Sequence, residues 1–129
     1  MPSLFKIDGK EYSGVGVEEL HRSFRIPDGP LADDMLSGDH ERDLIGTYYD
    51  YDLVLSVSDL LENEYDALFE TLSAPVNSHT VEMPYGAGAL SFTAMIQSGK
   101  DELIPMDDGT WWGNLSLTIL AKKPQRAAP

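Results

Sequence analysis

Residues 42–57 read RDLIGTYYDYDLVLSV, and this stretch decides the fold. From Tyr49 onward, apolar side chains occupy every second position to the end of the stretch. The positions between them begin with two carboxylates, Asp50 and Asp52. A period of two is typical of a β-strand with one face buried and the other facing water or a partner. The pattern therefore predicts a strand whose Tyr49 face builds the core and whose second face carries Tyr48, Asp50 and Asp52.

The size and composition of the chain predict one domain over residues 1–129. With 129 residues, of which 42% are hydrophobic, the chain has enough apolar side chains for a single core. No stretch approaches the roughly 20 apolar residues that span a bilayer, and no basic segment followed by an apolar run opens the sequence. We therefore expect a soluble protein made in the cytoplasm. The absence of cysteine excludes disulfides, thiolate nucleophiles and cysteine-bound zinc.

The net charge is strongly negative, at -13 from 22 acidic and 9 basic residues. Solubility is the plain explanation. A second explanation is a surface that repels nucleic acid, such as the wall of a channel through which DNA passes. Specific DNA binding is disfavoured, because affinity for phosphates depends on clustered Lys and Arg side chains.

The first part of the chain predicts strands around a tight turn. Residues 4–7 and 12–17 flank Asp8-Gly9, a dipeptide typical of β-hairpins. Near-alternation over residues 18–26 favours a further strand, with a helix as the alternative. Residues 27–41 are rich in Gly, Pro and Asp, and they predict a long loop that acts as a mobile arm.

One helix is predicted at about residues 60–72. Asp59 is a good N-cap, Glu62 completes a capping box, and apolar residues recur on one stripe. After it, alternation predicts strands at residues 80–83, 90–97 and 114–121, with turns at 84–88 and 107–109. Gly99 is expected to end the second of these strands, and residues 123–129 are expected to form a flexible tail. The order of elements predicts a mainly β (α+β) fold, an antiparallel β-sandwich or barrel with one packed α-helix.

No catalytic, cofactor-binding or metal site is predicted. The charged group Asp39, His40 and Asp43 lacks the spacing of metal ligands, and it is interpreted as a solvated loop with local ion pairs. No Gly-x-Ser-x-Gly elbow accompanies the histidines, and His79 is interpreted as a structural hydrogen-bonding residue. We therefore expect a protein that is not an enzyme.

Aromatic and acidic side chains instead suggest a subunit interface. Trp111 and Trp112 open the last strand, and they read either as one core and one rim residue or as an interface anchor. Replacing Tyr48 with Ala is expected to impair assembly more than folding. The candidate interface residues are Tyr48, Asp50, Asp52, Trp111, Trp112, Asp33 and Asp34.

Four segments together resemble small tail-associated structural proteins of tailed bacteriophages and prophages. They are RDLIGTYYDY (residues 42–51), YDALFETLSAPVNSH (residues 65–79), the turn Pro84-Tyr85-Gly86, and a terminal Trp-x-x-Leu-x-Leu that ends in Pro124-Gln125-Arg126. The resemblance covers about residues 6–126. It implies a β-sandwich or barrel with an accompanying helix that assembles into rings, as in tail-tube and distal-tail proteins, and it transfers no catalytic residue.

The resemblance implies a virion structural protein of the phage tail or its baseplate end. Its partners would be copies of itself in a ring of hexameric or trimeric symmetry and other tail proteins, with DNA passing through a lumen and no membrane contact. The alternative is a small acidic protein-binding module, such as an assembly chaperone or a host-factor inhibitor.

Overall fold

The computed structural model describes residues 5–12, 15–28, 33–34, 40–41, 44–57, 62–106 and 109–127. Within them the chain forms one helix and a set of antiparallel strands. The helix is α1 (Glu62–Leu72), and the strands are β1 (Lys6–Ile7), β2 (Lys10–Glu11), β3 (Val15–Arg25), β4 (Asp33–Asp34), β5 (His40–Glu41), β6 (Gly46–Val57), β7 (His79–Tyr85), β8 (Gly88–Met95), β9 (Gly99–Met106), β10 (Gly109–Ala121) and β11 (Arg126–Ala127).

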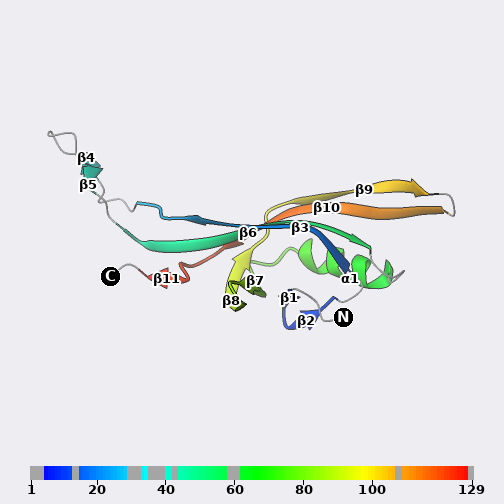
Figure 1. Ribbon diagram of the computed structural model, residues 1–129, viewed down its shortest axis with the longest axis horizontal. Helices are drawn as coiled ribbons and strands as arrows, with labels where there is room; N and C mark the ends of the chain where they lie inside the picture. Colours follow the sequence, from blue (N-terminus) through cyan, green and yellow to red (C-terminus); the bar gives the residue numbers. More distant parts are fainter. Residues whose placement is uncertain are drawn as a thin grey trace.

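Four long strands form the upper layer of the molecule in Figure 1. They lie in the order β3, β6, β10 and β9, so that β3 and β9 are the edges of this layer. The alternation in β6 is borne out on one face, because Tyr51, Leu53 and Leu55 are buried. Leu115, Leu117 and Ile119 of β10 are buried on the same side. The predicted core strand is thus the centre of the sheet.

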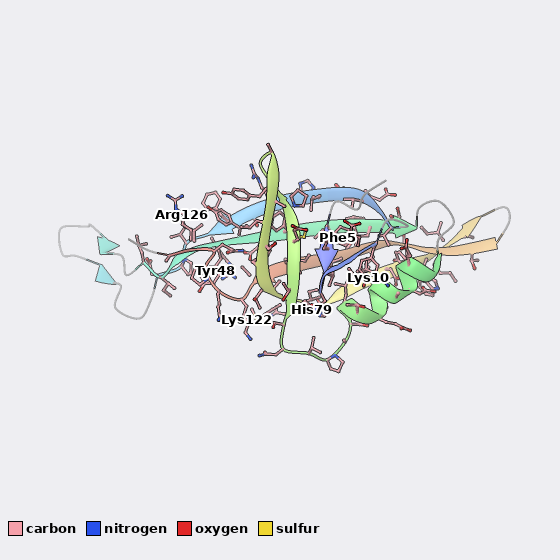
Figure 2. The ribbon with its side chains drawn as sticks, turned by 90° about the horizontal axis from the view of Figure 1, so that it is seen from below. Phe5, Lys10, Tyr48, His79, Lys122 and Arg126 are labelled. Atoms are coloured by element: carbon pink, nitrogen blue, oxygen red, sulfur yellow. The ribbon has the colours of Figure 1, made fainter. Side chains whose placement is uncertain are left out.

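The lower layer continues the same sheet. β8 pairs with the last two residues of β10, and the order then runs through β7 and β1 to β2. Nine of the described strands thus form one open sheet rather than a closed barrel, and β4 and β5 form a separate pair. Figure 2 shows β7 and β8 running across the long strands rather than along them. Two sheet layers that cross in this way enclose a core between their inner faces.

Helix α1 completes the lower layer. Its buried side chains, Tyr65, Leu68 and Leu72, recur at spacings of three and four, as an amphipathic helix requires. After Leu72 the Ser73 backbone N–H donates to the Phe69 carbonyl at 2.9 Å, which satisfies a carbonyl at the helix end. The predicted N-cap, Asp59, lies outside the described residues. The core consists of Phe5, Ile7, Tyr12, Val15, Tyr51, Leu53, Leu55, Tyr65, Leu68, Leu72, Val81, Met83, Phe92, Ala94, Leu115, Leu117, Ile119 and Ala121.

The mainly β class, the antiparallel pairing and the single helix are confirmed. The predicted hairpin at residues 8–9 is also confirmed, since Ile7 pairs with Lys10 and both turn residues have positive φ (53° and 82°). Residues 18–26 belong mostly to β3 and not to a helix.

Four details differ from the prediction. Gly99 does not end a strand but begins β9, and Pro84 and Tyr85 lie in β7, so that the β7–β8 turn is shorter than expected. Within the predicted loop 27–41, Asp33–Asp34 pairs with His40–Glu41, and Figure 1 shows this short ladder beyond the end of the long strands. The predicted tail contains β11, which pairs with Gly46 and Thr47 of β6.

No helix among the described residues is long and apolar enough to cross a membrane.

Candidate interaction surfaces

Asp50 lies inside the protein, which corrects the expectation that it faces a partner or a lumen. Only 6% of it is exposed. Its Oδ2 accepts a hydrogen bond from Arg25 Nε at 2.7 Å, and its Oδ1 accepts one from the Ala121 backbone N–H at 2.9 Å. Arg25 Nη2 also donates to the Ala121 carbonyl at 3.1 Å. Asp50 therefore pairs with the backbone N–H of Ala121 and Arg25 with its carbonyl, at the point where β10 leaves β6 to join β8.

Tyr48 is half-buried and packs against the edge of the core. The guanidinium of Arg25 lies 4.3 Å from the centre of its ring, within the range of a cation–π contact. Asp52 is exposed, and its Oδ1 accepts a hydrogen bond from Thr118 Oγ1 at 2.6 Å. Of the three predicted residues on this face of β6, Asp50 is buried, Tyr48 is half-buried and Asp52 is exposed.

At one end of the molecule, β3, β6 and β11 form an arm of the long sheet. The face of this arm opposite to Tyr48 and Asp52 carries a group of aromatic and cationic side chains. Tyr49 and Tyr85 meet edge to face, with ring centres 5.3 Å apart, and Arg22 lies 5.3 Å from the Tyr85 ring centre. Phe24 stands opposite Tyr49 in the β3–β6 ladder and is 69% exposed. We call Arg22, Phe24, Tyr49, Tyr85 and Arg126 the Arg–Tyr patch. It combines β3, β6, the end of β7 and β11, and Figure 2 shows Arg126 on this arm.

The hydroxyl groups in the Arg–Tyr patch are electrostatically coupled. A hydrogen bond with Tyr85, and after it one from Arg126, lowers the pKa of Tyr49. The hydrogen bond with Tyr49 raises the pKa of Tyr85. Among the described residues, no carboxylate forms an ion pair with Arg22 or Arg126. Arg22 therefore lies against the Tyr85 ring and Arg126 against the Tyr49 hydroxyl, and neither has an ion-pair partner within the part of the chain that the structure describes.

The β9–β10 hairpin forms a second arm at the other end of the molecule (Figure 1). Leu103 and Trp112 are directly paired on it and are 50% and 47% exposed. Asp101, two residues before Leu103, accepts a hydrogen bond from the Tyr65 hydroxyl of α1 at 2.9 Å. Because side chains two apart share a face, Leu103 and Trp112 lie on the side of the sheet that α1 covers. We call this surface the arm underside.

An irregularity in β10 places Trp112 on that side. Asn114 has a positive φ of 53°, and the β9–β10 register shifts between Gly113 and Ser116. In a regular strand Trp112 and the core residue Leu115, three positions apart, would face opposite sides. The extra residue brings them to the same side. Trp112 is therefore an exposed residue beyond the core, which fits both a rim position and an interface anchor.

The remaining candidates are only partly placed. The backbones of Asp33 and Asp34 pair with β5, and the backbone of Trp111 pairs with Ile104. The side chains of Asp33, Asp34 and Trp111 lie outside what the structure describes. The Asp39 and Asp43 group also lies outside it. Within the described residues, no three His, Asp or Glu side chains are grouped so that they could hold a metal ion. A pocket of about 400 Å³ between the end of α1 and the start of β9 has no titratable lining residue.

His79 has the structural role that was predicted for it. It is 5% exposed, and its Nδ1 lies 2.8 Å from Asp8 Oδ2. Asp8 Oδ1 accepts from the Thr80 backbone N–H at 3.0 Å, so this carboxylate fastens the β1–β2 turn to the start of β7. Desolvation acts to raise the pKa of Asp8, but the hydrogen bonds with His79 and Thr80 outweigh it, and the pKa is lowered.

Comparisons with protein-family models, with curated protein sequences and with solved structures gave no match, so the surfaces are interpreted from their own geometry.

Sequence reasoning missed the Arg–Tyr patch. Arg22 and Arg126 are separated by most of the chain, and only the β3–β6–β11 pairing brings their strands together. The one available signal was alternation, which sets Arg22 and Phe24 on the same face of a strand.

Proposed function

We propose that the protein is a structural subunit that assembles with copies of itself into a ring, in the tail of a bacteriophage or at its baseplate end. The observation that carries the proposal is the pair of open edge strands on two arms. β3 spans 11 residues and pairs with β6, and β9 spans 8 residues and pairs with β10; neither has a second neighbour among the described strands. Unpaired edges of this length invite pairing with another chain.

Exposed apolar side chains on both arms support the same proposal. Phe24, Ile26, Leu44 and Ile45 are exposed around the ends of β3 and β6, and Leu103 and Trp112 on the β9–β10 arm. Exposed large apolar groups gathered at the ends of an elongated subunit are typical of protein–protein contacts. The resemblance to tail-associated proteins supplies the biological setting, and the open sheet is compatible with it.

The outer face of the long sheet offers a candidate wall for a DNA channel. Glu19, Asp52 and Glu102 are exposed there on three strands, together with the cations Arg25 and Lys100. Carboxylates in such a wall repel phosphates and let DNA slide without binding. A structure of the assembled ring with a neutral or basic lumen would contradict this part of the proposal.

Light scattering after size exclusion, together with negative-stain microscopy, tests the assembly. We expect a discrete multimer or a ring at micromolar concentration. A monomer at every concentration would contradict self-assembly and would favour the alternative, an acidic binding module. That alternative is supported by the exposed carboxylates Asp66 and Glu70 on α1 and by the net charge of -13.

A further inference from the structure

We propose that copies of the chain associate head to tail, with the Arg–Tyr patch of one copy seated on the arm underside of the next. This inference rests on the proposed self-assembly and names the two surfaces that carry it. The patch lies at the β3–β6–β11 end and the underside at the β9–β10 end, so one subunit carries both halves of the contact (Figure 1).

The Arg–Tyr patch has the composition of an interaction hot spot. Tyrosine and arginine are enriched among the residues that dominate binding energy, and Phe24 adds a large apolar side chain. Stacking of Arg22 on the Tyr85 ring, 5.3 Å away, fixes the guanidinium before a partner arrives. A preorganised side chain loses less entropy on binding. In a chain with a net charge of -13, two arginines that form no ion pair with any described residue mark where a carboxylate-bearing partner is favoured.

The arm underside offers the complementary chemistry. Its exposed apolar pair, Leu103 and Trp112, lies next to the carboxylate of Asp101. Helix α1, which covers the adjoining part of the same face, adds the exposed carboxylate of Asp66. An apolar centre bordered by negative charge fits an aromatic centre bordered by arginine.

Charge also argues against contacts between like surfaces. Two Arg–Tyr patches face to face would oppose Arg22 and Arg126 to their own copies, and two undersides would oppose carboxylates. Like charges brought together in an interface disfavour the contact. The contact is therefore heterologous, and repeated heterologous contacts give a closed ring or an open filament.

Two complementary variants test the arrangement. The patch variant carries Phe24→Thr and Arg126→Glu, and the underside variant carries Leu103→Lys and Trp112→Thr. The patch variant keeps an intact arm underside, and the underside variant keeps an intact Arg–Tyr patch. In a solution of either variant alone, the surface that would bind the intact one is damaged on every copy. We therefore expect the self-association of each variant to weaken about tenfold or more. A 1:1 mixture should form a heterodimer that grows no further, seen as a doubled mass by native mass spectrometry.

The control variant carries Val76→Thr and Lys100→Glu, which change one exposed apolar and one exposed charged side chain outside both surfaces. It should assemble like the unmodified chain. Circular dichroism confirms folding, and Leu103→Lys alone replaces the double variant if Trp112→Thr unfolds the arm.

Each outcome decides the question. If both variants assemble like the unmodified chain, or if either one alone forms a stable dimer, the head-to-tail contact is overturned while self-assembly stands. If the unmodified chain is a monomer throughout, self-assembly itself fails, and the contact fails with it.

Discussion

The side-chain amide of Gln125 pairs with both backbone groups of Tyr49. Its Nε2 donates to the Tyr49 carbonyl at 2.9 Å, and its Oε1 accepts from the Tyr49 N–H at 2.9 Å. β6 pairs with β10 as far as Tyr51 and with β11 from Thr47, so Gln125 fills the interval between the two neighbours. One side chain thus replaces a strand residue and ties the end of the chain to the Arg–Tyr patch.

Replacing Gln125 with Ala is expected to free β11 from β6. Loss of two hydrogen bonds from a half-buried site should lower the free energy of unfolding by about 1–2 kcal/mol. Hydrogen exchange measured by NMR should show faster exchange at the Tyr49 amide. Gln97→Ala, at an exposed glutamine, is the matched control. Unchanged exchange at Tyr49 would contradict the bridging role.

Gly46 is the second element that docks the end of the chain. Its φ of 152° disfavours other residues, and a Cβ there would lie 2.6 Å from the Arg126 carbonyl oxygen and 2.8 Å from Pro124 Cβ. Gly46→Ala should therefore displace β11 and lower stability by about 2 kcal/mol or more, measured by chemical denaturation. Gly109→Ala is the matched control, because Gly109 has a similar φ (142°) but nothing within 4 Å of a Cβ, and it reports the backbone strain alone. Equal losses in both variants would refute the close contact.

Asp50 links two strands through charge and backbone contacts. Asp50→Ala leaves the Ala121 N–H unpaired and removes the carboxylate partner of Arg25, so we expect a loss of about 2–3 kcal/mol in denaturant unfolding. Asp50→Asn preserves the shape and an oxygen acceptor, and it should lose roughly half as much. A stability equal to that of the unmodified protein in Asp50→Ala would contradict the structural role.

The fold was largely readable from periodicity, and its exceptions have identifiable physical causes. The alternation in β6 and β8 predicted their buried faces, because a strand in a two-layer sheet keeps a period of two. It failed for Asp50, because the side chain fills the place where β10 turns away to β8, which is a long-range feature. It also failed for β9, where Glu102 and Leu103 carry no clear alternation and the pairing with β10 imposes the strand.

The candidate interface stays a prediction, and the structure shows only where its residues lie and how exposed they are. Trp112 was singled out from composition, and the structure leaves it exposed. Tyr48 was assigned to a free face, yet Arg25 covers it. Arg22 and Arg126 were missed, because residues so far apart in the sequence meet only through strand order.

Tyr48→Ala is now expected to affect folding as well as any assembly. Removing a half-buried ring and its contact with Arg25 should lower the melting temperature, by an amount that corresponds to about 1–2 kcal/mol. Tyr48→Phe keeps the ring face and serves as the control, with a change of about 0.5 kcal/mol or less. If Tyr48→Ala melts like Tyr48→Phe while its oligomerisation is impaired, the original assignment of Tyr48 to assembly holds and this prediction fails.

The contact between Asp8 and His79 predicts how stability depends on pH. The folded pKa of Asp8 is lowered, so its contribution is fully present above the pKa of an unfolded aspartate, about 3.9, and is lost as the pH falls through the folded value. Asp8→Asn keeps a residue that tolerates the positive φ of 53° at this turn. It should lower stability at pH 7 by about 1 kcal/mol at most, because the Asp8 side chain is 47% exposed and water screens the interaction.

Urea unfolding at a series of pH values measures this contribution. The difference between the unmodified protein and Asp8→Asn should be constant at neutral pH and should shrink below about pH 5. Asp66→Asn removes the same charge from an exposed position on α1 and should leave the acid limb of the curve unchanged. A difference between the unmodified protein and Asp8→Asn that persists unchanged to pH 2 would show that the turn is held by its backbone contacts and not by the carboxylate.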